Sequence, residues 1–176
     1  MNARLVAALL LSATCVAGCA AMPSPARLEG APRPFVLEEA LSGRMAGRGV
    51  ITPIIGAATT FDVTIDGSWD GKVLTLVEDF RYASGAVERK TWRLTRTPAG
   101  DYTGTREDVI GRAHAYRDGA ALRLDYTVAL DTPLGRSARF QDVLYWENGR
   151  TIRNRAIASK FGLRLARVDL QLSRSD

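Results

Sequence analysis

The stretch from Phe61 to Thr97, FDVTIDGSWDGKVLTLVEDFRYASGAVERKTWRLTRT, decides the fold class. Apolar and polar residues alternate in its first part and again around Trp92, which is the period of a β-strand with one buried face. Two groups of turn-forming residues, Asp66–Gly71 and Ser84-Gly85, separate these runs. The stretch is therefore predicted to be an antiparallel meander with strands near 61–65, 72–82 and 87–97.

The rest of the chain continues the same pattern. Turn signals recur at short intervals, the strongest being Asn148-Gly149, and no run is long enough to supply the crossover helix of a parallel sheet. In the run 137–147, Asp142 lies on the same face as Phe140, Leu144 and Trp146, so an acid is expected among large apolar side chains. A short helical turn is predicted at 35–41. Further strands are predicted at 44–52, 102–106, 109–116, 120–130, 137–147, 151–158 and 163–172.

About ten short strands joined by hairpins predict an all-β domain. Their consecutive order favours an up-and-down antiparallel barrel or half-barrel, because closure removes exposed sheet edges. Arg and Asp occupy the outward positions of the strands, so the lipid-facing apolar band of an outer-membrane barrel is not expected.

The first residues form a predicted secretion signal. Residues 5–16 are an apolar run too short for a permanent membrane helix. The run ends in Val16-Ala17-Gly18-Cys19, an aliphatic residue and two small residues before a cysteine, which resembles the lipobox of bacterial lipoproteins. We therefore expect a signal peptide at 1–18 and a lipid on the Cys19 thiol. The alternative is an ordinary secreted protein with a chance cysteine.

The segment after Cys19 has the composition of a tether. Residues 19–34 hold four of the seven prolines, and the predicted barrel domain covers 35–176. If Cys19 is lipidated, membrane lipid is the first partner of the protein. Because the second residue of the processed chain is Ala20 rather than Asp, we expect a periplasm-facing lipoprotein of the outer membrane.

Composition argues against several classes of site. The two cysteines, Cys15 and Cys19, both lie in the leader region, so no disulfide is expected in the processed chain. A single histidine, His114, gives no zinc site, and no cofactor motif is present. Basic residues are interspersed with acidic ones despite the net charge of +5, which argues against nucleic-acid binding. A monomer is expected.

Several segments resemble an uncharacterised family of Gram-negative bacterial lipoproteins, a domain of unknown function. The resemblance implies a one-domain lipoprotein with a lipocalin-like barrel and no established activity. The sequence departs from the family at Gly43-Arg44-Met45, where the family carries more aromatic character. The matching segments are Gly67–Gly71, Leu76–Phe80, Glu88–Trp92, Tyr102–Gly104, Asp108–Gly111, Asn154–Ala156 and Ser159–Gly162.

The candidate chemistry lies in acids near apolar strand positions: Glu78-Asp79, Glu107-Asp108 and Asp142. Neighbours in a strand point to opposite faces, so each pair offers one acid to each face. Such acids support general acid–base catalysis if burial separates their pKa values. The alternative is that they form ion pairs with nearby arginines or accept backbone N–H groups. No nucleophile elbow is present, and we expect no enzyme activity.

Small barrels can hold one small ligand, so a carrier of an apolar, fatty-acyl type of molecule is the first functional prediction. Basic residues within the strands are candidates for its anionic head. A structural or assembly lipoprotein without ligand is the second possibility, and a lipid-modifying enzyme the third. The predicted ligand-binding residues are Arg89, Trp92, Arg93, Arg155 and Lys160.

Replacing Cys19 by Ala tests the predicted anchor. The thiol is the only group at this position that can take the diacylglycerol, so the variant should lose palmitate labelling and remain unprocessed or soluble in the periplasm. Metabolic labelling with membrane fractionation measures both. Co-sedimentation of the wild-type protein with inner-membrane vesicles alone would contradict the predicted address.

Overall fold

The computed structural model describes residues 33–132 and 135–175, and this part of the chain forms one short helix and ten strands. The elements agree with the predicted all-β pattern, including the helical turn near residue 37. Their bounds are α1 Leu37–Leu41, β1 Gly43–Pro53, β2 Thr59–Trp69, β3 Val73–Tyr82, β4 Val87–Arg96, β5 Tyr102–Thr105, β6 Ala113–Asp118, β7 Ala121–Thr132, β8 Gly135–Trp146, β9 Thr151–Lys160 and β10 Leu163–Arg174.

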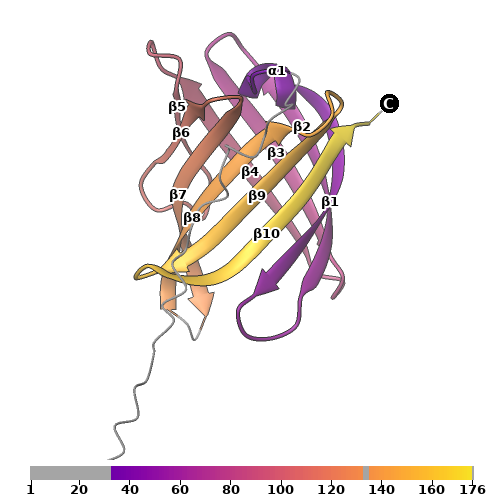
Figure 1. The fold of residues 1–176 in the computed structure, drawn as a ribbon, viewed down its shortest axis with the longest axis vertical. Helices are drawn as coiled ribbons and strands as arrows, with labels where there is room; N and C mark the ends of the chain where they lie inside the picture. The colour runs from indigo at the N-terminus through magenta and orange to yellow at the C-terminus, as the bar shows by residue number, and fades with distance from the viewer. Residues whose placement is uncertain (1–32, 133–134, 176) are drawn as a thin grey trace, which may run out of the picture.

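The strands form a closed antiparallel barrel. Each strand pairs with the next one along the chain, and β1 also pairs with β10, from Met45 opposite Arg174 to Pro53 opposite Ala166. Closure removes the two free edge strands that an open sheet would have. The prediction of a lipocalin-like up-and-down barrel of about ten strands is therefore confirmed, and the half-barrel alternative is excluded (Figure 1).

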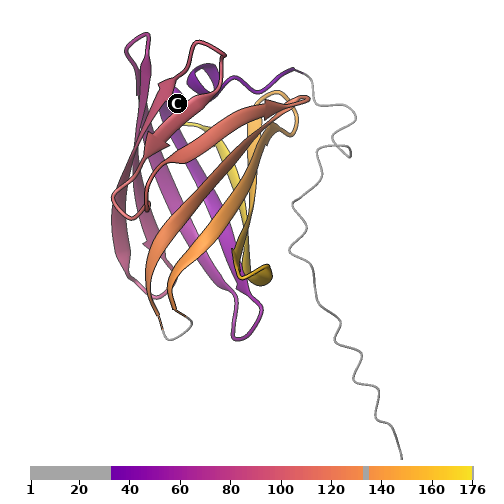
Figure 2. The ribbon, with the colours of Figure 1, turned by 90° about the vertical axis from the view of Figure 1, so that its left-hand side faces the viewer.

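Helix α1 lies across one end of the barrel (Figures 1 and 2). Its side chains Leu37 and Leu41, with Phe35 before it, are buried against the interior. The helix approaches β2 so closely that a Cβ on Gly67 would lie 1.8 Å from the carbonyl oxygen of Leu41. Only glycine fits at that position, so this end is sealed by contact between α1 and the β2 backbone.

The hairpins β1–β2, β3–β4, β7–β8 and β9–β10 surround the opposite end, which we call the mouth (Figure 2). Aromatic side chains near the mouth, including Phe80, Tyr82 and Phe140, are only partly buried, whereas Leu74 and Leu94 near α1 are fully buried. All buried apolar side chains of the described residues fall between Phe35 and Leu172. The described residues form one large core cluster, which includes α1, and a second small cluster of Ala121, Val143 and Tyr145.

Two predicted boundaries are wrong. The sequence predicts a turn at residues 66–69, but β2 continues to Trp69 because the missing side chain of Gly67 makes room for α1. The turn is confined to residues 70–72. A strand was expected at 109–116, but β6 begins only at Ala113. Within residues 106–112, Val109 makes one isolated bridge to Val128.

The predicted leader and anchor, residues 1–18 and Cys19, lie outside the described residues, as does the tether through residue 32. In the described part of the chain, no helix has both the length and the apolar character needed to cross a bilayer.

Trp92 tests the packing of the interior. Its side chain is 4% exposed and meets the Tyr126 ring edge-on, with 5.1 Å between the ring centroids. Removing a buried aromatic leaves a cavity, so Trp92→Ala should lower the free energy of unfolding by about 3–5 kcal/mol in urea titrations. Arg93→Ala, at the adjacent outward position, is the control and should change it by less than about 0.5 kcal/mol. A loss below about 1 kcal/mol for Trp92→Ala would contradict this packing.

Candidate functional site

The β5–β6 loop, residues 106–112, completes the barrel wall where the strands are short. Strand β5 has four residues, so the part of β4 nearer the mouth has no strand partner on that side. The loop takes the place of that partner: the Glu107 carboxylate accepts the backbone N–H of Thr91 at 2.8 Å, and the Asp108 carbonyl accepts that of Ala129 at 2.8 Å. These bonds connect β4 to β7 and direct Arg106 and Asp108 inward.

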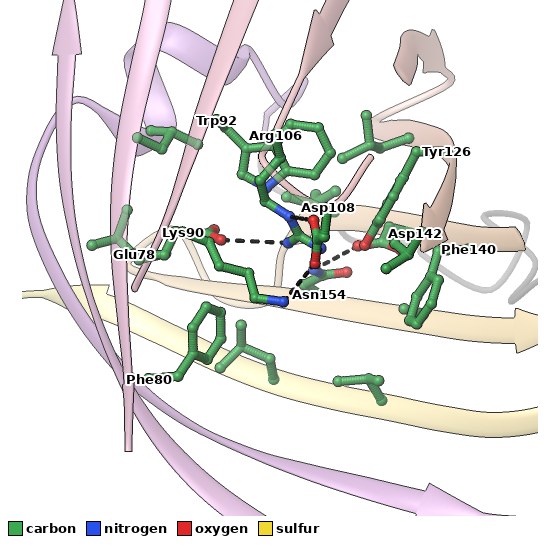
Figure 3. Close-up of a pocket in the computed structure, with 18 of the residues that line it drawn as sticks. Glu78, Phe80, Lys90, Trp92, Arg106, Asp108, Tyr126, Phe140, Asp142 and Asn154 are labelled. Atoms are coloured by element: carbon green, nitrogen blue, oxygen red, sulfur yellow. Dashed lines mark hydrogen bonds and ion pairs between the residues drawn. The ribbon is translucent and has the colours of Figure 1, made fainter. Parts of the chain in front are cut away.

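Asp108 forms the centre of an ion cluster inside the barrel (Figure 3). Arg106 donates Nε to Asp108 Oδ1 at 2.7 Å, and Lys90 donates Nζ to Asp108 Oδ2 at 2.5 Å. Although burial opposes it, hydrogen bonds from Arg106 and Lys90 hold the pKa of Asp108 below its ordinary value. Asp108 is therefore ionised at neutral pH and keeps both cations in place.

Arg106 extends across the interior from this cluster. Its guanidinium lies 4.8 Å from the centroid of the Trp92 ring and 5.5 Å from that of Tyr126, within the range of cation–π attraction. Its Nη1 is 3.7 Å from Glu78 Oε2, close enough for Coulomb attraction but too far for a hydrogen bond. Arg106 therefore brings a positive charge to the side of the cavity where Glu78 lies.

Among the residues that the structure describes, three acceptor oxygens of the barrel interior lack a hydrogen-bond partner. Asn154 Nδ2 donates to Asp142 Oδ2 at 3.1 Å, but Asp142 Oδ1 and Asn154 Oδ1 accept nothing. Glu78 Oε2 likewise accepts no hydrogen bond, although Arg106 Nη1 lies 3.7 Å away. A buried acceptor without a partner destabilises the fold by about 1–3 kcal/mol, so these atoms mark a place where a bound molecule or a proton is favoured.

The two acids of this group bind protons near neutrality. Burial raises the pKa of Glu78 to about 7, and the charge of Arg106 opposes the rise. Burial also raises the pKa of Asp142 to about 7, against the hydrogen bond from Asn154. Their side chains show why: Glu78 is 12% exposed and Asp142 4% exposed. Each acid therefore changes charge close to physiological pH.

All of these groups line a cavity of about 240 Å³ inside the barrel. It reaches from Leu37 and Leu41 at the sealed end to Phe80 and Tyr82 at the mouth, and the polar groups lie between these ends (Figure 3). Most of the remaining lining is apolar. The polar members of the lining are Glu78, Lys90, Arg106, Asp108, Tyr126, Asp142 and Asn154. One apolar cavity with a few convergent polar groups is the usual form of a small-molecule site.

Three of the basic residues predicted to bind a ligand face outward. Arg89 pairs with Asp79 at 2.6 Å on the outer surface, Arg155 pairs with Asp169 at 3.1 Å, and Arg93 is exposed beside Trp92. The expectation that their side chains point into the barrel is wrong. A strand alternates its faces residue by residue, so Trp92 and Arg93 cannot both point inward.

The other two predicted residues lie at different places. Trp92 lines the cavity as predicted. Lys160 ends β9 at the mouth, where its Nζ is 5.5 Å from the centroid of the Phe161 ring, and it is not among the residues that line the cavity. The structure therefore brings Trp92 together with four polar groups that the sequence interpretation did not name as ligand-binding: Lys90, Arg106, Tyr126 and Asn154.

The predicted split of the acid pairs is confirmed. Glu78 and Asp108 line the cavity, while Asp79 pairs with Arg89 outside and Glu107 binds the β4 backbone. Among residues 33–132 and 135–175, no three His, Cys, Asp or Glu side chains are grouped so as to hold a metal ion. Of the acids inside the barrel, Asp108 is bonded to two cations, whereas Glu78 and Asp142 each keep an oxygen without a hydrogen-bond partner.

Comparisons with known proteins give a family and a fold. A family model described as "Protein of unknown function (DUF3833)" matches residues 13–174. The S-type phycobiliprotein lyase CPES from Guillardia theta is similar with a TM-score of 0.61 at 10% identity, over 79% of this chain and 90% of that one. The crystal structure of Rv2717c from M. tuberculosis is similar with a TM-score of 0.56 at 16% identity, over 78% of this chain and 94% of that one. No curated protein matches. At these identities, the two structures share the barrel fold.

The raised pKa values predict how stability depends on pH. Glu78 and Asp142 keep their protons up to about pH 7 when folded, whereas such groups release them near pH 4 when unfolded. The folded state thus binds more protons between these limits, and stability falls as pH rises through them. One pKa unit corresponds to about 1.4 kcal/mol. As the pH rises from 5 to 8, the free energy of unfolding of Asp142→Asn should therefore increase by on the order of 2 kcal/mol relative to that of the wild type.

Urea unfolding at several pH values measures this difference. Asn keeps the acceptor for Asn154 but cannot ionise, so the variant isolates the titration. Asp66→Asn, an exposed acid on the outer face of β2, is the control and should follow the wild-type curve. Parallel stability curves for wild type and Asp142→Asn would contradict the prediction.

Proposed function

This chain belongs to the DUF3833 family of proteins of unknown function, and we propose that it is a membrane-anchored periplasmic lipoprotein that binds a fatty acid inside its barrel. The family match confirms the predicted domain of unknown function. The fold is compatible with ligand binding. The observation that carries the proposal is the cavity itself, in which two protonatable acids with unpaired oxygens lie beside Arg106 and Lys90.

The interior charges fit one carboxylate. Among the residues that line the cavity, Lys90 and Arg106 contribute two positive charges and Asp108 one negative charge, which leaves +1 when Glu78 and Asp142 are protonated. Glu88, which pairs with Lys90 at 3.3 Å, is half exposed and lies outside this lining. A single fatty-acid carboxylate brings this sum to zero. The protonated acids can also donate hydrogen bonds through the oxygens that lack partners. When both acids are ionised the sum is −1, which disfavours an anion.

The apolar lining fits a hydrocarbon chain. Between the polar groups and the mouth, the cavity is lined by side chains such as Phe61, Phe80, Val128 and Phe140. This lining supports a bound acyl chain of medium length, with its carboxyl group at Arg106 and its tail toward the mouth, where the aromatic side chains are partly exposed.

The proposed anchor rests on the sequence before the barrel. Val16-Ala17-Gly18-Cys19 supports lipidation at Cys19, and Ala20 supports sorting to the outer membrane. A carrier held at that membrane stays close to a source of acyl chains. The predicted monomer also fits, because the cavity is formed within one chain.

Two alternatives differ in what the cavity does. A structural or assembly lipoprotein that binds no ligand would be expected to have a solidly packed barrel. The cavity of about 240 Å³ argues against this function. A lipid-modifying enzyme needs two acids whose pKa values are separated, whereas burial raises the pKa values of Glu78 and Asp142 alike to about 7. Mass spectrometry of the bound molecule before and after incubation distinguishes carrying from turnover.

Binding to the chain from Ala20 to Asp176, which contains the whole described barrel and its core, tests the proposal. Decanoic acid should bind more tightly at pH 6 than at pH 8, by at least about tenfold, because the anion requires protonated Glu78 and Asp142. The neutral monoglyceride of the same chain should bind with little pH dependence. Isothermal titration calorimetry gives both affinities.

Matched variants assign the effect to the interior. Glu78→Gln with Asp142→Asn should abolish the pH dependence for decanoic acid, since neither side chain can then ionise. Arg106→Gln should weaken binding by about tenfold or more, because it removes the inner cation. Arg155→Ala, on the outer face of β9 next to Asn154, should have no effect. Affinities weaker than millimolar for every ligand, or affinity lost in Arg155→Ala, would reject the proposal.

A further inference from the structure

The two ends of the barrel differ in their exposed apolar side chains. Five of the seven large apolar side chains exposed by the described residues lie in the hairpins at the mouth. The turns at the sealed end instead carry polar residues, such as Asp70-Gly71, Asp118-Gly119 and Asn148-Gly149. Exposed apolar groups gathered at one end mark an interaction surface rather than the usual scatter. The five residues at the mouth are Ile54, Ile55, Val87, Phe161 and Leu163.

Phe161 is held in an unfavourable backbone conformation at the tip of the β9–β10 hairpin. Its φ is +50° and that of Gly162 is +79°, so both central residues of the turn lie in the left-handed region. Asn is the usual residue at the first of these positions, and a bulky aromatic is rare there. The Phe161 side chain is nonetheless 92% exposed. The chain therefore keeps an aromatic at a position where it weakens the turn and makes little contact with the core.

A basic groove adjoins this turn. It has a volume of about 520 Å³ and is lined by Arg136, Arg139, Lys160 and Phe161, together with neutral residues. Arg139 is also paired with Asp125 at 2.9 Å. Three cations beside an exposed aromatic complement an anionic headgroup next to apolar lipid chains, which is the chemistry of an interfacial membrane contact.

We propose that the mouth of the barrel docks onto an anionic lipid surface, with Ile55, Val87 and Phe161 entering the interface and the basic groove binding headgroups. This contact goes beyond the proposed lipid anchor, because it orients the barrel. It places the cavity opening against the membrane, so that an apolar ligand can pass without crossing water. The docking itself does not depend on whether a ligand is bound.

The length of the tether permits this orientation. The chain enters the barrel at the sealed end, where the Phe35 N–H bonds to the carbonyl of Ala120. From Cys19 to Arg33 is a separation of 14 residues, which spans at most about 50 Å. Strand β10 has 12 residues and is about 40 Å long at about 3.3 Å per residue. An anchor at Cys19 can therefore reach a membrane in contact with the mouth.

The test uses the chain from Ala20 to Asp176, which lacks the proposed lipid. It is mixed with vesicles of phosphatidylcholine, with or without one quarter phosphatidylglycerol, and sedimented. The wild-type chain should bind the anionic vesicles at least tenfold more strongly than the neutral ones. Ile55→Ser with Phe161→Asn should lose at least tenfold of that binding, while Ile110→Ser, an exposed apolar residue of the β5–β6 loop, should stay within twofold.

Thermal unfolding separates lost docking from lost folding. Because Asn is favoured in the left-handed region, Phe161→Asn should raise the melting temperature while it lowers membrane binding. Equal binding of the wild-type chain to both kinds of vesicle, or full binding by the double variant, would overturn the proposal. So would a concentration-dependent dimer in gel filtration that the double variant abolishes, because the mouth would then be an interface between copies of this chain.

Discussion

The Asp108 carboxylate, shared by Arg106 and Lys90, is the interaction on which the interior of the barrel depends. Burying these three groups is costly unless each is paired, and one acid serves both cations. The same acid lies in the loop that fills the wall between β4 and β7. Closure of the barrel and arrangement of its interior charges are thus coupled. Loss of Asp108 alone would leave Arg106 with only the Glu78 carboxylate at 3.7 Å and Lys90 with only Glu88 at 3.3 Å, and would loosen the wall beside them.

The fold was predictable from sequence because its signals are local. Alternation along single strands and glycine-containing turns identify most strands, and closure follows from the number of hairpins. The sequence prediction is wrong where distant residues override the local pattern. Gly67 has the sequence context of a turn glycine, but it accommodates α1. Residues 109–112 have the pattern of a strand, but contacts of their loop with β4 and β7 hold them in an irregular conformation. Neither contact is visible within a short window of sequence.

The site was predictable only in part. Trp92 and the acids Glu78, Asp108 and Asp142 were named from their apolar surroundings, and the structure places all four in the cavity. The predicted basic residues Arg89, Arg93 and Arg155 do not follow the alternation that places Trp92 inside. Applied consistently, that alternation selects Lys90 on the same face as Trp92 and Leu94. Arg106 lies in an irregular loop, where no periodicity gives the direction of a side chain.

The seal formed by α1 has a kinetic consequence. Because the helix packs across one end of the described barrel, a molecule in the cavity leaves by the side from which it entered, and a second molecule cannot displace it from behind. For the proposed ligand, exchange would then be ordered, with release before loading, and its residence time would be governed by events at the rim rather than by competition inside. A barrel of this form responds to the surroundings of its opening more than to the bulk concentration of ligand.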